Sequence, residues 1–153
     1  MKVVGEKSVS SIIKISLIVI FIFGSLVVAF LPLVVKQYIL MLRLDLRDLY
    51  IPCLVILYAS GIPALVIIHQ FIKLFGALKN NKPFERTNVR YLKIASITSI
   101  IIAVEYIPAM FIFRSLFTLI ITGIFFIAWL GLYVLSELFK QAIEYKEENE
   151  LTI

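Results

Sequence analysis

The chain has 153 residues, of which 61% are hydrophobic and only 16% are charged, and its formal net charge is +5. Soluble domains carry about 25% charged residues, so this composition excludes an ordinary soluble fold. The single cysteine excludes an internal disulfide, and the single histidine excludes a two-histidine zinc motif. We treat residues 1–153 as one domain. We expect no cofactor and no direct nucleic-acid binding, because membrane topology explains the basic charge.

Four long apolar segments follow one another along the chain. Uncharged runs cover residues 15–35, 49–72 and 115–136, and a fourth run at 94–113 is interrupted only by Glu105. Each holds about 20 residues, the length that an α-helix needs to cross about 30 Å of hydrocarbon. The sequence therefore predicts an all-α membrane protein with four transmembrane helices. We expect these helices at about residues 12–35, 49–78, 88–113 and 115–145.

Basic residues in the connecting segments predict the orientation of these helices. Positively charged residues in short loops mark the cytoplasmic side of a membrane. With both termini inside, the cytoplasmic segments hold eleven Lys and Arg residues and the outer segments hold four. The opposite orientation reverses this ratio, so we expect both termini and residues 73–93 to be cytoplasmic.

The two outer connections differ in character. Residues 36–48 alternate leucine with other residues, and this period of two allows an extended segment on the outer surface. An outward continuation of the second helix is the alternative. The other outer connection is nearly absent, because only Arg114 and Ser115 separate the third and fourth apolar segments. These two residues predict a tight hairpin.

The most polar part of the chain is residues 79–93, "KNNKPFERTNVRYLK". Pro83 lacks an amide hydrogen and disfavours helical angles at the residue before it, so the second helix should end there. Thr87 or Asn88 is suited to cap the third helix, and Phe84 is expected to tuck under the helix ends. We expect a basic interfacial turn that touches anionic lipid or, alternatively, a docking site for a partner.

The stretch "GALKNNKPFERTNVRYLKIA" and the C-terminal "AIEYKEENELTI" together resemble the DUF2975 (YoaS-like) family of small bacterial four-helix membrane proteins. In that family a Pro-Phe pair precedes an Asn and a basic residue at the start of the third helix, here Pro83, Phe84, Asn88 and Arg90. The resemblance covers essentially the whole chain. It implies four helices, location in the bacterial plasma membrane (the inner membrane where there are two) and no assigned enzyme activity. Genes of this family often stand beside one for a small helix-turn-helix regulator, which implies a cytoplasmic partner of that kind.

Glu105 lies close to the bilayer centre, where a charged residue costs about 2.5–3.5 kcal/mol to insert. Counting to the same depth along the other helices reaches Ser25, Ser60 and Thr122. We expect Glu105 to point into the four-helix interior as a protonated carboxyl that hydrogen-bonds between helices. A polar ligand or ion pocket and a proton relay are the alternatives, although a relay normally needs several ionisable groups.

The fourth helix is expected to continue into the cytoplasm as an amphipathic tail. An apolar face with the helical i, i+3, i+4, i+7, i+8 spacing is formed by Leu135, Leu138, Phe139, Ala142 and Ile143. The opposite face and the end are rich in glutamate and repel anionic lipid, so the apolar face should pack on protein. We expect Phe139 and Ile143 to fold against residues 79–93, with docking of a partner as the alternative.

No Gly-rich phosphate loop, Ser-His-Asp set or carboxylate pair occurs in the sequence, so we expect a protein that is not an enzyme. The first hypothesis is a membrane module whose loop 79–93 and tail 137–153 bind a regulator or another membrane subunit, including a second copy of the chain. The alternative is a small transporter or ligand sensor with a polar pocket around Glu105. The candidate interaction residues are Pro83, Phe84, Asn88, Arg90, Phe139 and Ile143.

Overall fold

The computed structural model describes the backbone of residues 4–41, 46–79 and 85–151. These ranges form five α-helices: α1 (Val4–Ala29), α2 (Leu31–Met41), α3 (Leu46–Lys79), α4 (Arg86–Phe113) and α5 (Leu116–Leu151). Four of them, α1, α3, α4 and α5, are long and apolar enough to cross a membrane. The prediction of a helical membrane protein with four spans is confirmed.

The first predicted helix, residues 12–35, differs from the structure in its start and its continuity. α1 already begins at Val4, and a turn at Phe30 separates it from α2. Pro32 lies in the first turn of α2 and has no amide hydrogen, so the bond to the carbonyl four residues earlier is missing. The Val34 amide still donates to the Phe30 carbonyl at 3.1 Å. Because this bond spans the turn, the two helices follow each other without an intervening loop.

α2 answers the question left open for residues 36–48. Residues 36–41 are helical, so the extended alternative is wrong for that part, while residues 42–45 lie outside the described residues. Helical spacing explains the difference: Leu31, Val35 and Ile39 recur every four residues, are buried, and pack against the first part of α3. The two described leucines of the alternation, Leu40 and Leu46, are both helical. α3 begins at Leu46, three residues before the expected start at residue 49, so the alternative of an outward continuation of the second helix is confirmed for residues 46–48.

α4 begins at Arg86, and Glu85 is its N-cap residue. Glu85 has extended backbone angles (φ −115°, ψ 142°), and its carbonyl accepts the amide of Asn88 at 2.9 Å without a side-chain capping bond. The predicted caps, Thr87 and Asn88, are wrong because both residues lie inside the first turn. Pro83 and Phe84 lie outside the described residues.

The hairpin between α4 and α5 is confirmed. Arg114 adopts the left-handed conformation (φ 46°, ψ 37°), and its amide donates to the Met110 carbonyl at 3.0 Å, which ends α4. The Ser115 hydroxyl oxygen then accepts the Phe117 amide at 3.3 Å at the start of α5. Ser115 therefore acts as a helix cap.

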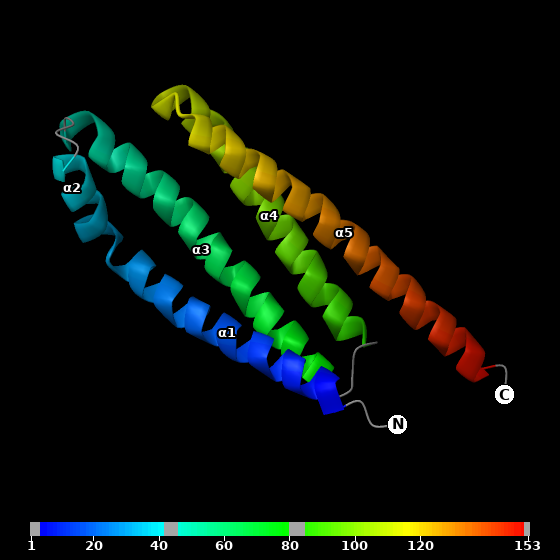
Figure 1. Cartoon of the computed structure of the whole chain (residues 1–153). Helices are drawn as coiled ribbons and strands as arrows, with labels where there is room; N and C mark the ends of the chain where they lie inside the picture. The colour runs from blue at the N-terminus through cyan, green and yellow to red at the C-terminus, as the bar shows by residue number, and fades with distance from the viewer. Residues whose placement is uncertain (1–3, 42–45, 80–84, 152–153) are drawn as a thin grey trace.

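The helices form an open row, in which α4 packs on α5 and α3, and α3 also packs on α1 and α2 (Figure 1). Among the described residues, no Cα atom of α1 lies within 8 Å of α4 or α5, and none of α3 lies that close to α5. The four spans therefore do not surround a common interior. α4 is the most enclosed, with 33% of an 18-residue apolar stretch buried against 6% or less of the corresponding stretches in the other three.

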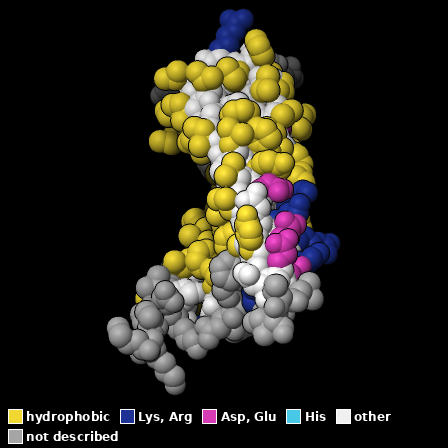
Figure 2. All heavy atoms as spheres, turned by 90° about the vertical axis from the view of Figure 1, so that its right-hand side faces the viewer, with side chains coloured by type: hydrophobic (Ala, Val, Ile, Leu, Met, Phe, Trp, Pro, Cys, Tyr) yellow, Lys and Arg dark blue, Asp and Glu magenta, His cyan; other side chains and the backbone are white. Residues whose placement is uncertain are grey.

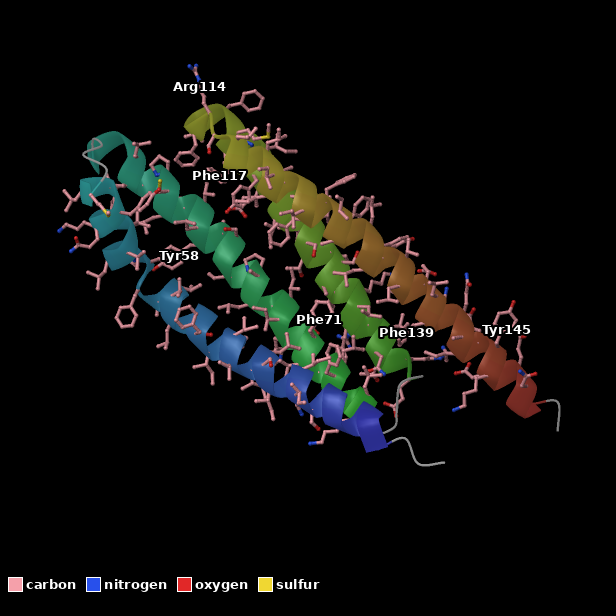
Figure 3. All side chains as sticks on the ribbon, viewed as in Figure 1. Tyr58, Phe71, Arg114, Phe117, Phe139 and Tyr145 are labelled. Atoms are coloured by element: carbon pink, nitrogen blue, oxygen red, sulfur yellow. The ribbon has the colours of Figure 1, made fainter. Side chains whose placement is uncertain are left out.

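The polar ends of the row match a spanning arrangement. The start of α1 and the end of α5 lie at one end of the row, and Arg114 lies at the other (Figures 1 and 3). Figure 2 shows hydrophobic side chains over most of the visible surface, while acidic and basic side chains gather toward the end of α5.

Candidate functional site

Glu105 lies on α4, directly before Tyr106, whose hydroxyl contacts α3. Its side chain is half-buried, and its Oε1 atom is shielded from solvent without a hydrogen-bond partner among the described residues. Ser96 marks the α5 side of α4, because its hydroxyl donates to the Trp129 carbonyl at 3.2 Å. Glu105 is about two and a half helical turns from Ser96 and so points to the opposite side of α4.

The hydroxyls expected around Glu105 make other hydrogen bonds. Ser25, Ser60 and Thr122 each donate to the backbone carbonyl four residues earlier, at 2.7, 2.8 and 2.8 Å. Ser25 is on α1, which does not approach α4, and Thr122 is on α5, which packs on the other side of α4. The predicted bonds from these hydroxyls to Glu105 are therefore not formed. Equal depth in the membrane did not ensure that the side chains face one another.

Tyr106 is one of the intramembrane polar residues that sequence reasoning missed. Its hydroxyl lies 3.3 Å from Ser60 Oγ in a buried contact between α4 and α3. Because Ser60 Oγ already donates to its own helix, the Tyr106 hydroxyl is the donor to Ser60. A sequence signal was present, since Tyr106 lies three residues beyond Ala103 on the buried small-residue face of α4.

A second group of candidate residues lies where α5 extends along the first turns of α4. Ile143 is only 4% exposed, Phe139 is half-buried, and Asn88 of α4 is fully buried. The Glu147 carboxylate accepts two hydrogen bonds from the Arg86 guanidinium, from Nη2 at 2.7 Å and from Nε at 3.2 Å. The tail thus packs on residues 86–93, the helical part of the predicted docking partner. Whether this end is cytoplasmic stays a prediction.

The ion pair between Arg86 and Glu147 is open to water. Their side chains are 78% and 48% exposed, so solvent weakens the attraction between them. The hydrogen bond from Arg86 nevertheless lowers the pKa of the Glu147 carboxyl from its ordinary value. Glu147 lies well past Ser136, where the uncharged run ends. The pair therefore adds little to the stability of the docked tail.

The predicted apolar face of the tail is divided between two surfaces. Ile143 faces α4, whereas Leu138 is 54% exposed and Tyr145 is 68% exposed. Leu138 and Tyr145 are about two turns apart and lie on the same side of α5, and Figure 3 shows Tyr145 projecting away from α4. We call Leu138 and Tyr145 the outer tail surface. Arg90 is also exposed, on α4.

Comparison with known proteins gives two matches. The model of a family described as "Protein of unknown function (DUF2975)" matches residues 42–153, which include the whole of α3, α4 and α5. Over 108 residues the chain is 31% identical to the uncharacterized membrane protein YoaS of Bacillus subtilis (strain 168), covering 63% of this chain and 68% of that protein. No solved structure matches the chain.

Proposed function

This chain belongs to the DUF2975 family of membrane proteins of unknown function, and from that premise we propose that it is a regulatory or interaction module without enzyme activity. It lies in the bacterial inner (plasma) membrane with both termini in the cytoplasm, as the distribution of basic residues favours. Its cytoplasmic surface binds a protein partner such as a small helix-turn-helix regulator.

The observation that carries this proposal is the length and exposure of α5. Its 36 residues make a helix of about 54 Å, whereas the hydrocarbon core is about 30 Å thick. The helix therefore projects beyond the bilayer. One side of the projection packs on α4 through Ile143. The other side leaves Leu138, near the level of the lipid headgroups, and Tyr145, two turns further out, uncovered by the chain.

The outer tail surface suits a protein partner. An aromatic and an aliphatic side chain on a helix that is already formed can bind a partner's pocket with little ordering cost. The partner surface should therefore contain an apolar pocket for these two side chains.

The test is capture of the helix-turn-helix protein encoded by the neighbouring gene from detergent-solubilised membranes. We expect the double variant Leu138→Ala and Tyr145→Ala to lose capture. The matched control is Phe111→Ala with Phe117→Ala, because these side chains are 77% and 75% exposed beside the hairpin that joins α4 to α5. Capture that survives the tail variant, or that both variants abolish, contradicts the proposal.

A small transporter or membrane ligand sensor is the second candidate function. It is favoured by the shielded Glu105 Oε1 atom, because a ligand with a hydrogen-bond donor would satisfy it. On this alternative, Glu105→Gln and Glu105→Ala abolish activity while capture of the cytoplasmic partner is unchanged. If the first proposal is correct, both variants capture the helix-turn-helix protein and function as the wild type does.

A further inference from the structure

One exposed stripe runs along the side of α4 that is turned away from its neighbouring helices. Its members recur every three or four residues, as one helix face requires. They are Arg86, Arg90, Lys93, Ile97, Ile101 and Val104. The three apolar members are 51%, 53% and 56% exposed. The stripe thus changes from cationic to apolar at a single point between Lys93 and Ile97.

This point coincides with the expected edge of the hydrocarbon. About 20 residues, or about 30 Å of helix, separate Lys93 from the hairpin at Arg114, which matches the thickness of the bilayer core. Arg90 and Lys93 therefore lie at the level of the lipid headgroups, and Ile97 and Ile101 lie at the level of the acyl chains. The placement holds whichever side of the membrane this end faces.

The cations of this region differ in their pairing. Arg86 is bound by Glu147, and Lys140 of α5 lies 3.9 Å from Glu144. Among the described residues, no carboxylate pairs with Arg90 or Lys93. These two side chains are exposed, one turn apart, with positive charge that no described acid offsets.

A nearby hollow between α4 and α5 is a weaker candidate for an anion. It has a volume of about 200 Å³ and is lined by Arg86, Val89, Lys140, Ile143 and Glu144. The glutamate in its wall and the Glu147 bound to Arg86 offset both cations. Charge complementarity therefore favours the stripe over the hollow.

We infer that the α4 stripe is a binding site for an anionic phospholipid. The lipid phosphate binds at Arg90 and Lys93, and an acyl chain lies along Ile97, Ile101 and Val104. Arg presents planar donors that match phosphate oxygens, and cations near the surface attract anionic lipid. A free phosphate compound would leave the apolar half of the stripe uncovered. The inference is independent of the proposed partner binding.

Native mass spectrometry of the purified full-length protein tests the site. The protein is titrated with phosphatidylglycerol and, separately, with phosphatidylcholine that has the same acyl chains. We expect more phosphatidylglycerol adducts, and we expect Arg90→Gln with Lys93→Gln to reduce this preference by about fivefold for each cation removed. The matched control is Lys36→Gln with Arg114→Gln, which removes the same charge from exposed positions elsewhere and should keep the preference.

Three results would overturn the inference: equal binding of the two lipids, an unchanged preference in the Arg90 and Lys93 variant, or an equal loss in the control variant. Glycerol phosphate at the same concentration should not displace the lipid, because it lacks the acyl chain. Displacement by glycerol phosphate would assign the site to soluble phosphates and overturn the lipid assignment. Since the altered side chains are exposed, circular dichroism should show unchanged helix content in both variants.

Discussion

The hydroxyl of Tyr106 on α4 lies 3.3 Å from Ser60 Oγ on α3, inside the apolar part of both helices. Water is absent from the bilayer core, so a polar side chain there depends on protein partners. The contact joins the pair formed by α1 and α3 to the pair formed by α4 and α5. Tyr106 directly follows Glu105 in the chain, so the two side chains point about 100° apart around α4.

This hydrogen bond should stabilise the folded protein by an amount typical of hydrogen bonds between membrane helices. Hydrogen bonds between membrane helices contribute about 0.6 kcal/mol on average and up to about 1.7 kcal/mol. We expect a double-mutant cycle of Tyr106→Phe and Ser60→Ala to give a coupling energy in this range when unfolding is measured by steric trapping in bicelles. Tyr133→Phe, at a side chain that is 47% exposed, is the control and should show no coupling to Ser60→Ala.

The sequence was sufficient to predict the four spans, because their length and lack of charge are set by the bilayer and not by the neighbouring helices. It was also sufficient for the hairpin at Arg114, where no residues remain to form a longer loop. It was insufficient for the surroundings of Glu105. Counting residues along the chain gives the depth of Ser25 or Thr122 in the membrane. It does not give the neighbouring helix that each side chain faces, because the neighbours in an open row differ from those in a closed bundle.

Two glycines offer a second prediction, on the packing of α1 against α3. A Cβ atom at Gly61 would lie 3.1 Å from Val28 Cγ2, whereas one at Gly123 would have open space within 4 Å. Replacement of glycine by alanine in a helix gains up to about 1 kcal/mol from helix propensity. Val28 is β-branched and has restricted rotamers, so it moves aside with difficulty. We therefore expect Gly61→Ala to be less stable than Gly123→Ala by thermal unfolding, and the reverse order contradicts the packing.

Burial of Ile143 should hold the α5 tail on α4. Truncation of a buried isoleucine to alanine costs about 2–5 kcal/mol, and Ile143 is only 4% exposed. We expect Ile143→Ala to increase hydrogen exchange in residues 137–149 while exchange in the apolar part of α5 stays slow. Leu138→Ala is the control, since its side chain is 54% exposed, and it should leave exchange unchanged. Equal exchange in the two variants would show that the tail is held by other contacts.

The same docking should depend weakly on pH through Glu147. The hydrogen bond from Arg86 lowers the pKa of this carboxyl in the folded state. The contribution of the ionised Glu147 carboxyl to docking is therefore fully present above the pKa of the unfolded state. It is lost as the pH falls through the lowered pKa of the folded state. We expect the distribution of distances between spin labels at positions 87 and 149 to broaden slightly on acidification when Glu147 is present. In Glu147→Gln the distribution should already show this small broadening at neutral pH and should be insensitive to acid.

The orientation of the chain can be tested at the two ends of the row. Both ends of the described chain lie at the end of the row opposite Arg114 (Figures 1 and 3), so one position at each end decides between the two orientations. In a Cys53→Ser background, we expect Arg114→Cys to react with a membrane-impermeant maleimide in intact cells. Asn149→Cys should react only after the membrane is permeabilised. The variants keep the excess of basic residues on the side of the termini, since Arg114→Cys removes a cation from the outer side. Labelling of position 149 in intact cells would place the outer tail surface and its proposed regulator on opposite sides of the membrane, and the proposed function would then be wrong.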